Sequence, residues 1–409
     1  MRAVIYSLIL GLAITASLRQ VVGDEKLTEA VQDAIGQGLF LTPLIRKGLL
    51  EEARNASEDN MEISKIKSNK PVKSYSGYLT INDTTQANLF FWFFPAQKNP
   101  DVAPVILSVN EYPGHSALKG VFLEQGPFYI NEKYELIERE FSWTKTHSML
   151  YIDAPAGSGF SFSLSLEGLA TNSEEEASEI YSTLIQFFTL FQDFQQRDFY
   201  LVGKSYAGSF IPHIVKKIDT ENKNSPLKIN LKGAIIGSPW TDSLQQYHYS
   251  NYMYKLGLIG DNQLKTLLDT ESQLQEEIEK GNIYKAFQLA QALSGSQSYM
   301  LNFTGFDYLS SALISHEPEE FHRYLDFLES GEVQKYLHVG LHEFVGYDSL
   351  AIGRFGNANE GYSTVERVFT VDGCLNYTPF NDLPSSKYEY GTGFSIKHWE
   401  KIIYRFLNG

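Results

Sequence analysis

The sequence predicts an α/β protein with a mixed, mostly parallel sheet flanked by helices and an inserted helical cap. Between residues 74 and 242, short β-rich runs alternate with helical stretches, which is the pattern of parallel strands joined by crossover helices. Residues 243–335 contain helical patterns without a convincing strand, and this change indicates the cap. The 409-residue length fits one large α/β domain with insertions, or two ordinary domains.

The core elements follow from local patterns. Tyr78–Ile81 and Leu89–Phe94 are β-rich and flank a turn-like segment, so we expect them to form a hairpin. The aromatic run Phe90–Phe94 is interpreted as core strand rather than as a ligand cage. Four more β-rich runs each lead into a loop: Val105–Val109, Met149–Ile152, Phe199–Val202 and Leu231–Ile236. Helices are expected at Glu174–Phe191 and from about Ser209.

The remaining segments complete the expected domain organisation. Residues 24–73 are charged and are expected to be a surface lead-in without a core of their own. The helical patterns of the cap lie at Asp261–Glu279, Ile283–Leu293 and Pro318–Glu329. Residues 336–409 have a strand-like run at Arg367–Val371 and a final amphipathic helix at His398–Leu407. They are interpreted as a shortened C-terminal part of the core.

The first 23 residues predict the compartment. Arg2 supplies a positive charge, Ala3–Ile14 is mostly apolar, and Val21–Gly23 is a plausible cleavage site. The apolar run is too short to span a bilayer, so residues 1–23 are interpreted as a cleaved signal peptide rather than as a buried helix. We therefore expect a secreted or lysosomal (vacuolar) protein without a membrane span. Asn-x-Ser/Thr sequons support this route, at Asn55, Asn82 and Asn302, with a less favourable one at Asn376.

Composition excludes several classes of partner. The 34 basic and 49 acidic residues give a net charge of −15, which disfavours nucleic acid and anionic membrane surfaces. The single cysteine, Cys374, excludes an internal disulfide and a multi-cysteine zinc site. Its thiol is expected to be buried or to pair between molecules. No metal or other cofactor is expected.

One segment carries a candidate nucleophile. Phe199–Gly208 (FYLVGKSYAG) combines a β-rich run, a serine flanked by glycines and the start of a helix. We interpret it as a nucleophile elbow of the Gly-x-Ser-x-Gly type, in which a strained turn exposes the Ser205 hydroxyl. The amide of Tyr206 is then expected to face an oxyanion. The alternative is a Gly/Ser turn without chemistry.

This elbow and several other segments resemble the serine carboxypeptidases of the α/β-hydrolase fold, most of all the vitellogenic-like carboxypeptidase branch. The segments occur in the family's order: Leu39–Gly48, Leu89–Gln97, Asn110–Gly114, Leu123–Phe128, Ser148–Ser163, Gly203–Gly208, Gly237–Asp242 and Glu332–Gly340. The resemblance implies an α/β-hydrolase core with a helical cap, and peptide or protein C-termini as substrates if the protein is active. It also allows a homodimer.

The resemblance shows departures at the expected catalytic triad. The family's acid loop, Asn-Gly-x-x-Asp, matches Asp372–Asn376 best, so Asn376 replaces the acid and lacks the charge that steadies an imidazolium. The family's base follows a strand that ends in Gly-x-Gly-His. Here Gly391–Gly393 is followed by Phe394. We therefore expect the strand that carries the base to be missing, unless the sequence is truncated.

Two binding positions are also altered relative to the family. Asn110–Gly114 (NEYPG) replaces Asn-Gly-Gly-Pro-Gly, so the second oxyanion amide is that of Tyr112, and Glu111 adds a charge hostile to an oxyanion. Lys204 replaces a glutamate that binds the substrate's terminal carboxylate in the family, whereas Asn110 is retained. The resemblance thus implies Asn110 and Lys204 as carboxylate-binding residues.

Other titratable residues are assigned structural roles in preference to catalytic ones. His115 is the nearest substitute base by motif, although a loop histidine without chemistry is favoured. Structural or surface roles are expected for His213, His338 and His398. Asp153 is expected to bind loop backbone amides.

Two functions remain open at this point. The first is a secreted serine carboxypeptidase-like protein with weak or no peptidase activity. The second is an active serine-type carboxypeptidase that releases C-terminal residues through an acyl-enzyme on Ser205. An esterase or acyltransferase on the same fold is a weaker third hypothesis.

Overall fold

The computed structural model describes residues 38–58, 66–67, 72–111, 114–295, 297–309, 311–340, 342 and 344–345. The expected signal peptide, the strand-like run at Arg367–Val371, the final helix and Asn376 lie outside the described residues. So does Tyr112.

The core is a six-stranded mixed sheet, as the sequence predicts. Its strand order is β2-β3-β7-β4-β8-β9, in which β2 pairs with β3 and β3 with β7 in antiparallel fashion, and the other pairs are parallel. The strands are β2 (Tyr75–Asn82), β3 (Ala87–Phe94), β4 (Val105–Ser108), β7 (Ser148–Ile152), β8 (Phe199–Lys204) and β9 (Leu231–Gly237). The predicted hairpin and the four further strands are confirmed.

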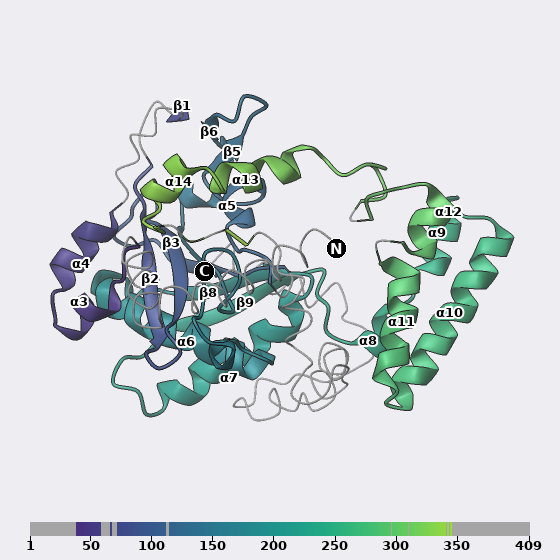
Figure 1. The fold of residues 1–409 in the computed structure, drawn as a ribbon, viewed down its shortest axis with the longest axis horizontal. Coiled ribbons are helices and arrows are strands. Elements are labelled where there is room, and N and C mark those ends of the chain that lie inside the picture. Colours follow the sequence, from purple (N-terminus) through teal and green to yellow (C-terminus); the bar gives the residue numbers. More distant parts are fainter. Residues whose placement is uncertain are drawn as a thin grey trace, which may run out of the picture.

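Helices cover both faces of this sheet (Figure 1). On one face lie α6 (Ser173–Leu190) and α7 (Ala207–Asn222), and on the other α5 (Lys119–Leu123), α13 (Glu320–Leu328) and α14 (Gly331–Tyr336). Strand β3 shows the two-residue alternation most clearly. Phe91 and Phe93 belong to the first buried cluster, and Phe90, Trp92 and Phe94 to the second. The aromatic run is therefore core, as expected.

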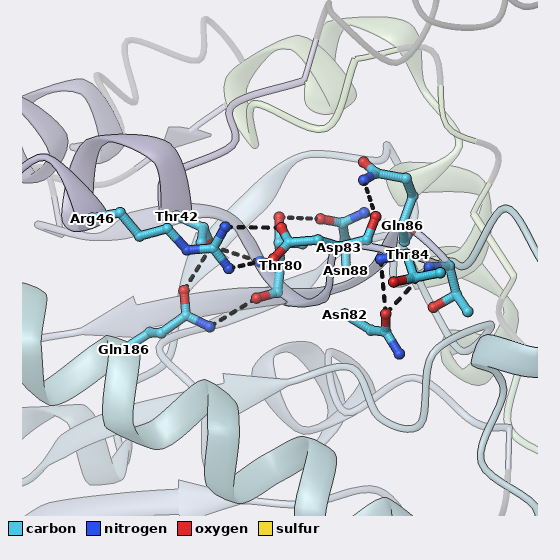
Figure 2. A network of polar contacts seen from close by, with 10 residues as sticks. Thr42, Arg46, Thr80, Asn82, Asp83, Thr84, Gln86, Asn88 and Gln186 are labelled. Atoms are coloured by element: carbon cyan, nitrogen blue, oxygen red, sulfur yellow. Dashed lines mark hydrogen bonds and ion pairs between the residues drawn. The ribbon is translucent and has the colours of Figure 1, made fainter.

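The N-terminal helices α3 (Thr42–Arg46) and α4 (Leu50–Ser57) pack against the core rather than forming a separate surface segment. Leu41 and Ala53 are fully buried in the first cluster. Figure 2 shows how polar side chains connect α3, the β2–β3 hairpin and α6. The Thr42 hydroxyl donates to Gln186 Oε1 (2.6 Å) and accepts from the Thr80 amide (2.7 Å).

The helical cap has its own buried cluster, separate from the two that line the sheet. The cap consists of α8 (Ser243–Gln246), α9 (Ser250–Lys255), α10 (Asp261–Glu279), α11 (Ile283–Ser294) and α12 (Tyr299–Thr304), on the right of Figure 1. Helices α13 and α14 lie within the segment predicted as cap, but Tyr324, Phe327 and Val333 pack in the second core cluster. Helix α13 meets α5 and β5, and α14 packs beside α13, so both helices belong to the core side of the molecule.

A small second sheet, of order β1-β6-β5, was not predicted from the sequence. Its strands are β1 (Ile66–Lys67), β5 (Phe128–Ile130) and β6 (Leu136–Glu138), each too short to give a clear periodicity. Short 3-10 helices occur at η1 (Trp143–Lys145), η2 (Leu166–Gly168) and η3 (Gln192–Phe194). Within the described ranges, no helix has both the length and the apolar character needed to cross a membrane.

Candidate active site

Ser205 lies in a tight turn between the end of β8 and the start of α7. Its φ angle is 55°, in the left-handed region that non-glycine residues rarely adopt. Three backbone hydrogen bonds hold this conformation. The Ser205 amide donates to the Gly237 carbonyl (3.0 Å), and the Ser205 carbonyl accepts from the amides of Trp240 (2.7 Å) and Gly208 (3.0 Å). This is the strained geometry expected of a nucleophile elbow.

The glycines of the elbow serve close packing, although their spacing differs from the predicted pattern. The second glycine is Gly208, three residues after Ser205, and Ala207 occupies the position two residues after it. A Cβ atom at Gly203 would lie 2.5 Å from the Ala207 Cβ, and one at Gly208 would lie 2.6 Å from the Pro239 Cβ. Both positions therefore require glycine, because strand, helix and the following loop meet here.

The amide of Tyr206 does not face an empty oxyanion position in this structure. It donates a hydrogen bond of 3.0 Å to the carbonyl oxygen of Glu111. The oxyanion role expected for this amide stays a prediction. An oxyanion would first have to displace the Glu111 carbonyl.

Charged side chains form a compact network beside the elbow. Nζ of Lys204 contacts the carboxylate of Glu111, and it also lies 2.7 Å from Oε1 of Glu124. Nζ of Lys119 lies 2.7 Å from the second carboxylate oxygen of Glu111. The Glu111 side chain is 16% exposed and that of Lys204 46%. Burial lowers the pKa of Lys204, and it raises the pKa of Glu124 against the opposing charge of Lys119.

Two members of this network, Lys119 and Glu124, were not predicted from the sequence. Glu124 lies in a segment noted only for its resemblance to the family, and it meets Lys204 from 80 positions away in the chain. A buried or half-buried lysine needs a carboxylate partner nearby, and that requirement was the one available signal. In this structure the ammonium group of Lys204 already contacts two carboxylates of the protein, those of Glu111 and Glu124. A substrate carboxylate would have to compete with them for Lys204.

A cavity of about 10 Å³ adjoins the network, lined by Asn110, Glu111, His115, Lys119 and Glu124 among others. Its size suits about one water molecule. Asn110 is 2% exposed and lines this cavity, and its carboxylate-binding role stays a prediction. The pKa of His115 is lowered to about 4, first by burial and then by the charge of Lys119. His115 is therefore neutral at physiological pH.

No histidine is hydrogen-bonded to the Ser205 hydroxyl among the residues that the structure describes. His338 instead lies on the opposite sheet edge, where its Nδ1 is 3.2 Å from the Ser76 hydroxyl, and its predicted structural role is confirmed. Asp153 also has the predicted role. Its buried carboxylate accepts from the amides of Ala117 and Phe160 (both 2.9 Å) and from the Ser116 hydroxyl (2.6 Å).

The mixed sheet, the elbow after β8 and the helical cap define a protein of the α/β-hydrolase type. A solved structure supports this class. The Kex1 prohormone-processing carboxypeptidase of Saccharomyces cerevisiae superposes with a TM-score of 0.66 over 84% of both chains, at 20% sequence identity. This likeness concerns the fold. The family follows from the sequence: the family model "Serine carboxypeptidase" matches residues 65–369, and the chain belongs to that family.

Curated relatives agree with this assignment. The chain is 38% identical over 320 residues to the venom serine carboxypeptidase of Apis mellifera, covering 77% of this chain and 68% of the relative. It is 39% identical over 317 residues to the probable serine carboxypeptidase CPVL of Homo sapiens (76% and 65%). It is 38% identical over 324 residues to the vitellogenic carboxypeptidase of Aedes aegypti (77% and 67%). The matched region thus spans about two thirds of the length of these relatives.

Proposed function

We propose that this protein is a secreted serine carboxypeptidase-like protein whose Ser205 site has weak or no peptidase activity. The observation that carries the proposal is the hydrogen bond from the Tyr206 amide to the Glu111 carbonyl. An acyl-transfer site needs preorganised donors aimed at the developing oxyanion, and one lost donor costs about 10²–10³ in kcat. Here a backbone oxygen of the same protein already uses that donor.

The expected triad supports the same proposal. A serine hydroxyl is a poor nucleophile unless a base within hydrogen-bond reach accepts its proton. Asn376 at the acid position and Phe394 after Gly391–Gly393 are the sequence features that argue against such a base. Both lie outside the described residues, so these assignments rest on the sequence. The Tyr112 amide, the second expected oxyanion donor, rests on it as well.

An active serine-type carboxypeptidase is the alternative, and the elbow itself favours it. Ser205 keeps the strained φ of 55° that such a nucleophile needs. In this alternative the substrate's carbonyl displaces that of Glu111 from the Tyr206 amide, and peptide or protein C-termini are the substrates. Asn110 and Lys204 then bind the terminal carboxylate.

Two assays on the full-length protein separate these functions. A fluorophosphonate probe reports whether Ser205 is nucleophilic, and a blocked dipeptide with a free C-terminus reports hydrolysis. The proposal expects labelling at least about 10²-fold slower than that of an active serine hydrolase of the same fold, and dipeptide hydrolysis at or little above that of the Ser205→Ala variant. Labelling of Ser205 together with hydrolysis would establish the active alternative.

Entry into the secretory pathway and glycosylation are part of the proposal. Asn55, Asn82 and Asn302 are all exposed, which a glycan requires. Asn82 lies at the β2–β3 turn, where its Oδ1 accepts from the amides of Thr84 (2.9 Å) and Thr85 (3.2 Å) (Figure 2). A mass decrease after treatment of the secreted protein with an N-glycosidase, smaller by one glycan in an Asn82→Gln variant, tests this site. A homodimer is tested by light scattering.

A further inference from the structure

Glu111 contacts two different anion-binding groups of the site at once. Its side-chain carboxylate lies between the ammonium groups of Lys204 and Lys119. Its backbone carbonyl accepts from the Tyr206 amide (3.0 Å). One residue therefore supplies both a carboxylate and a carbonyl oxygen next to Ser205. A bound peptide C-terminus would present the same two groups.

The charges of the network balance without a ligand. Lys204 and Lys119 contribute two positive charges, and Glu111 and Glu124 contribute two negative charges. Glu111 contacts both lysines, whereas Glu124 contacts Lys204 and feels the charge of Lys119 at longer range. The Glu111 and Lys119 side chains are only 16% and 20% exposed, so solvent screens their interaction incompletely. Without Glu111, the site would contain two ammonium groups, those of Lys204 and Lys119, and one carboxylate, that of Glu124.

We infer that Glu111 is an internal ligand that occupies a carboxylate-binding site formed by Lys204 and Lys119. The carboxylate of a ligand must displace the Glu111 carboxylate from the two lysines. While Glu111 neutralises them, a ligand with a carboxylate should bind with about the same affinity as a ligand without one. A variant without this carboxylate should recognise a free C-terminal carboxylate. The inference rests on the proposed function, because the carboxylate-binding site lies beside Ser205, where we propose weak or no peptidase activity.

Equilibrium binding tests the inference without requiring catalysis. The probes are fluorescein-labelled alanyl-phenylalanyl-phenylalanine with a free C-terminus and the same peptide with a C-terminal amide, followed by fluorescence polarisation. The full-length protein carries Ser205→Ala, so that hydrolysis cannot interfere. We expect that E111G and E111Q bind the free acid about tenfold more tightly than the amide, as one charge-assisted contact allows. With Glu111 present, the affinity for the free-acid peptide and the affinity for the amide peptide should agree within about threefold.

Matched variants assign the effect to Glu111. E124Q removes the same charge but leaves Glu111 between the two lysines, so its preference for the acid should stay within about threefold. E111Q/K204M should lose the preference that E111Q gains. E111Q retains the size of the side chain, so its preference for the acid or the amide tests the inference if E111G does not fold.

Failure of this inference is distinct from failure of the proposed function. Equal affinity of E111Q for acid and amide, or no binding of the acid, would overturn the inference. A tenfold preference for the acid when Glu111 is present would overturn it as well. Labelling of Ser205 in the protein that retains the serine tests the proposed function alone.

Discussion

The Tyr206 amide donates its hydrogen bond to the carbonyl oxygen of Glu111, 3.0 Å away. This bond connects the elbow after β8 to the loop after β4, two neighbouring parallel strands whose C-terminal ends meet at the same sheet edge. It leaves the φ of 55° at Ser205 in place while it engages the amide that the proposed function assigns to an oxyanion. Retained elbow geometry is therefore compatible with the weak or absent activity that we propose.

Close packing at Gly203 gives the first prediction. Gly203→Ala should lower the free energy of unfolding by about 2–3 kcal/mol, because its Cβ would lie 2.5 Å from the Cβ of Ala207, an atom that no side-chain rotation can move away. Gly331→Ala is the matched control, since no atom lies within 4 Å of its Cβ and its φ is not positive. Urea unfolding of both variants measures the difference, and equal midpoints would contradict the packing argument.

Backbone strain at Ser205 gives the second prediction. Ser205→Gly should raise the free energy of unfolding by about 1 kcal/mol over Ser205→Ala, because glycine adopts a φ of 55° without a Cβ penalty. Thermal unfolding of the two variants compares them without any contribution from the hydroxyl. A less stable glycine variant would show that the elbow is not strained.

The third prediction concerns Asp153, which connects the loops on either side of the site. Asp153→Ala should lower the free energy of unfolding by about 3 kcal/mol, because it leaves buried amides at Ala117 and Phe160 and the Ser116 hydroxyl without their acceptor. Asp83→Ala, which removes an exposed ion pair to Arg46, should cost less than about 1 kcal/mol. Denaturant unfolding of both variants checks the contrast, and a similar cost for the two would refute it.

The fourth prediction is a pH dependence of stability from His115. Its folded-state pKa is lowered to about 4 from 6.5, so the unfolded chain binds a proton first as the pH falls. The protein should lose up to about 3 kcal/mol of stability between pH 6.5 and pH 4, relative to a His115→Asn variant. Parallel unfolding curves for the two proteins over this range would contradict the burial of a neutral imidazole.

The sequence predicts the central sheet well because its strands are apolar or aromatic runs of four to eight residues bounded by turns. The three-residue strands β5 and β6 could not be predicted, since so short a segment has no measurable period. The periodicity of α13 identifies an apolar face but not the surface that covers it, so its packing on the core required the structure.

In the candidate site, too, one part could be predicted from the sequence and another part required the structure. The Ser205 elbow follows from a local motif whose glycines and strand-to-helix transition are visible in ten residues. The bond between Tyr206 and Glu111 and the ion pair between Lys204 and Glu124 join residues far apart in the chain. No local pattern encodes them, because each depends on which strand ends the fold brings together.

Labelling of Ser205 by a fluorophosphonate tests the central claim most directly. An active serine hydrolase of the same fold, treated in parallel, sets the reference rate. The account predicts that the folded full-length protein is labelled at least about 10²-fold more slowly than this reference, as the loss of a positioned base and oxyanion donor requires. Stoichiometric labelling of Ser205 at the reference rate would contradict it.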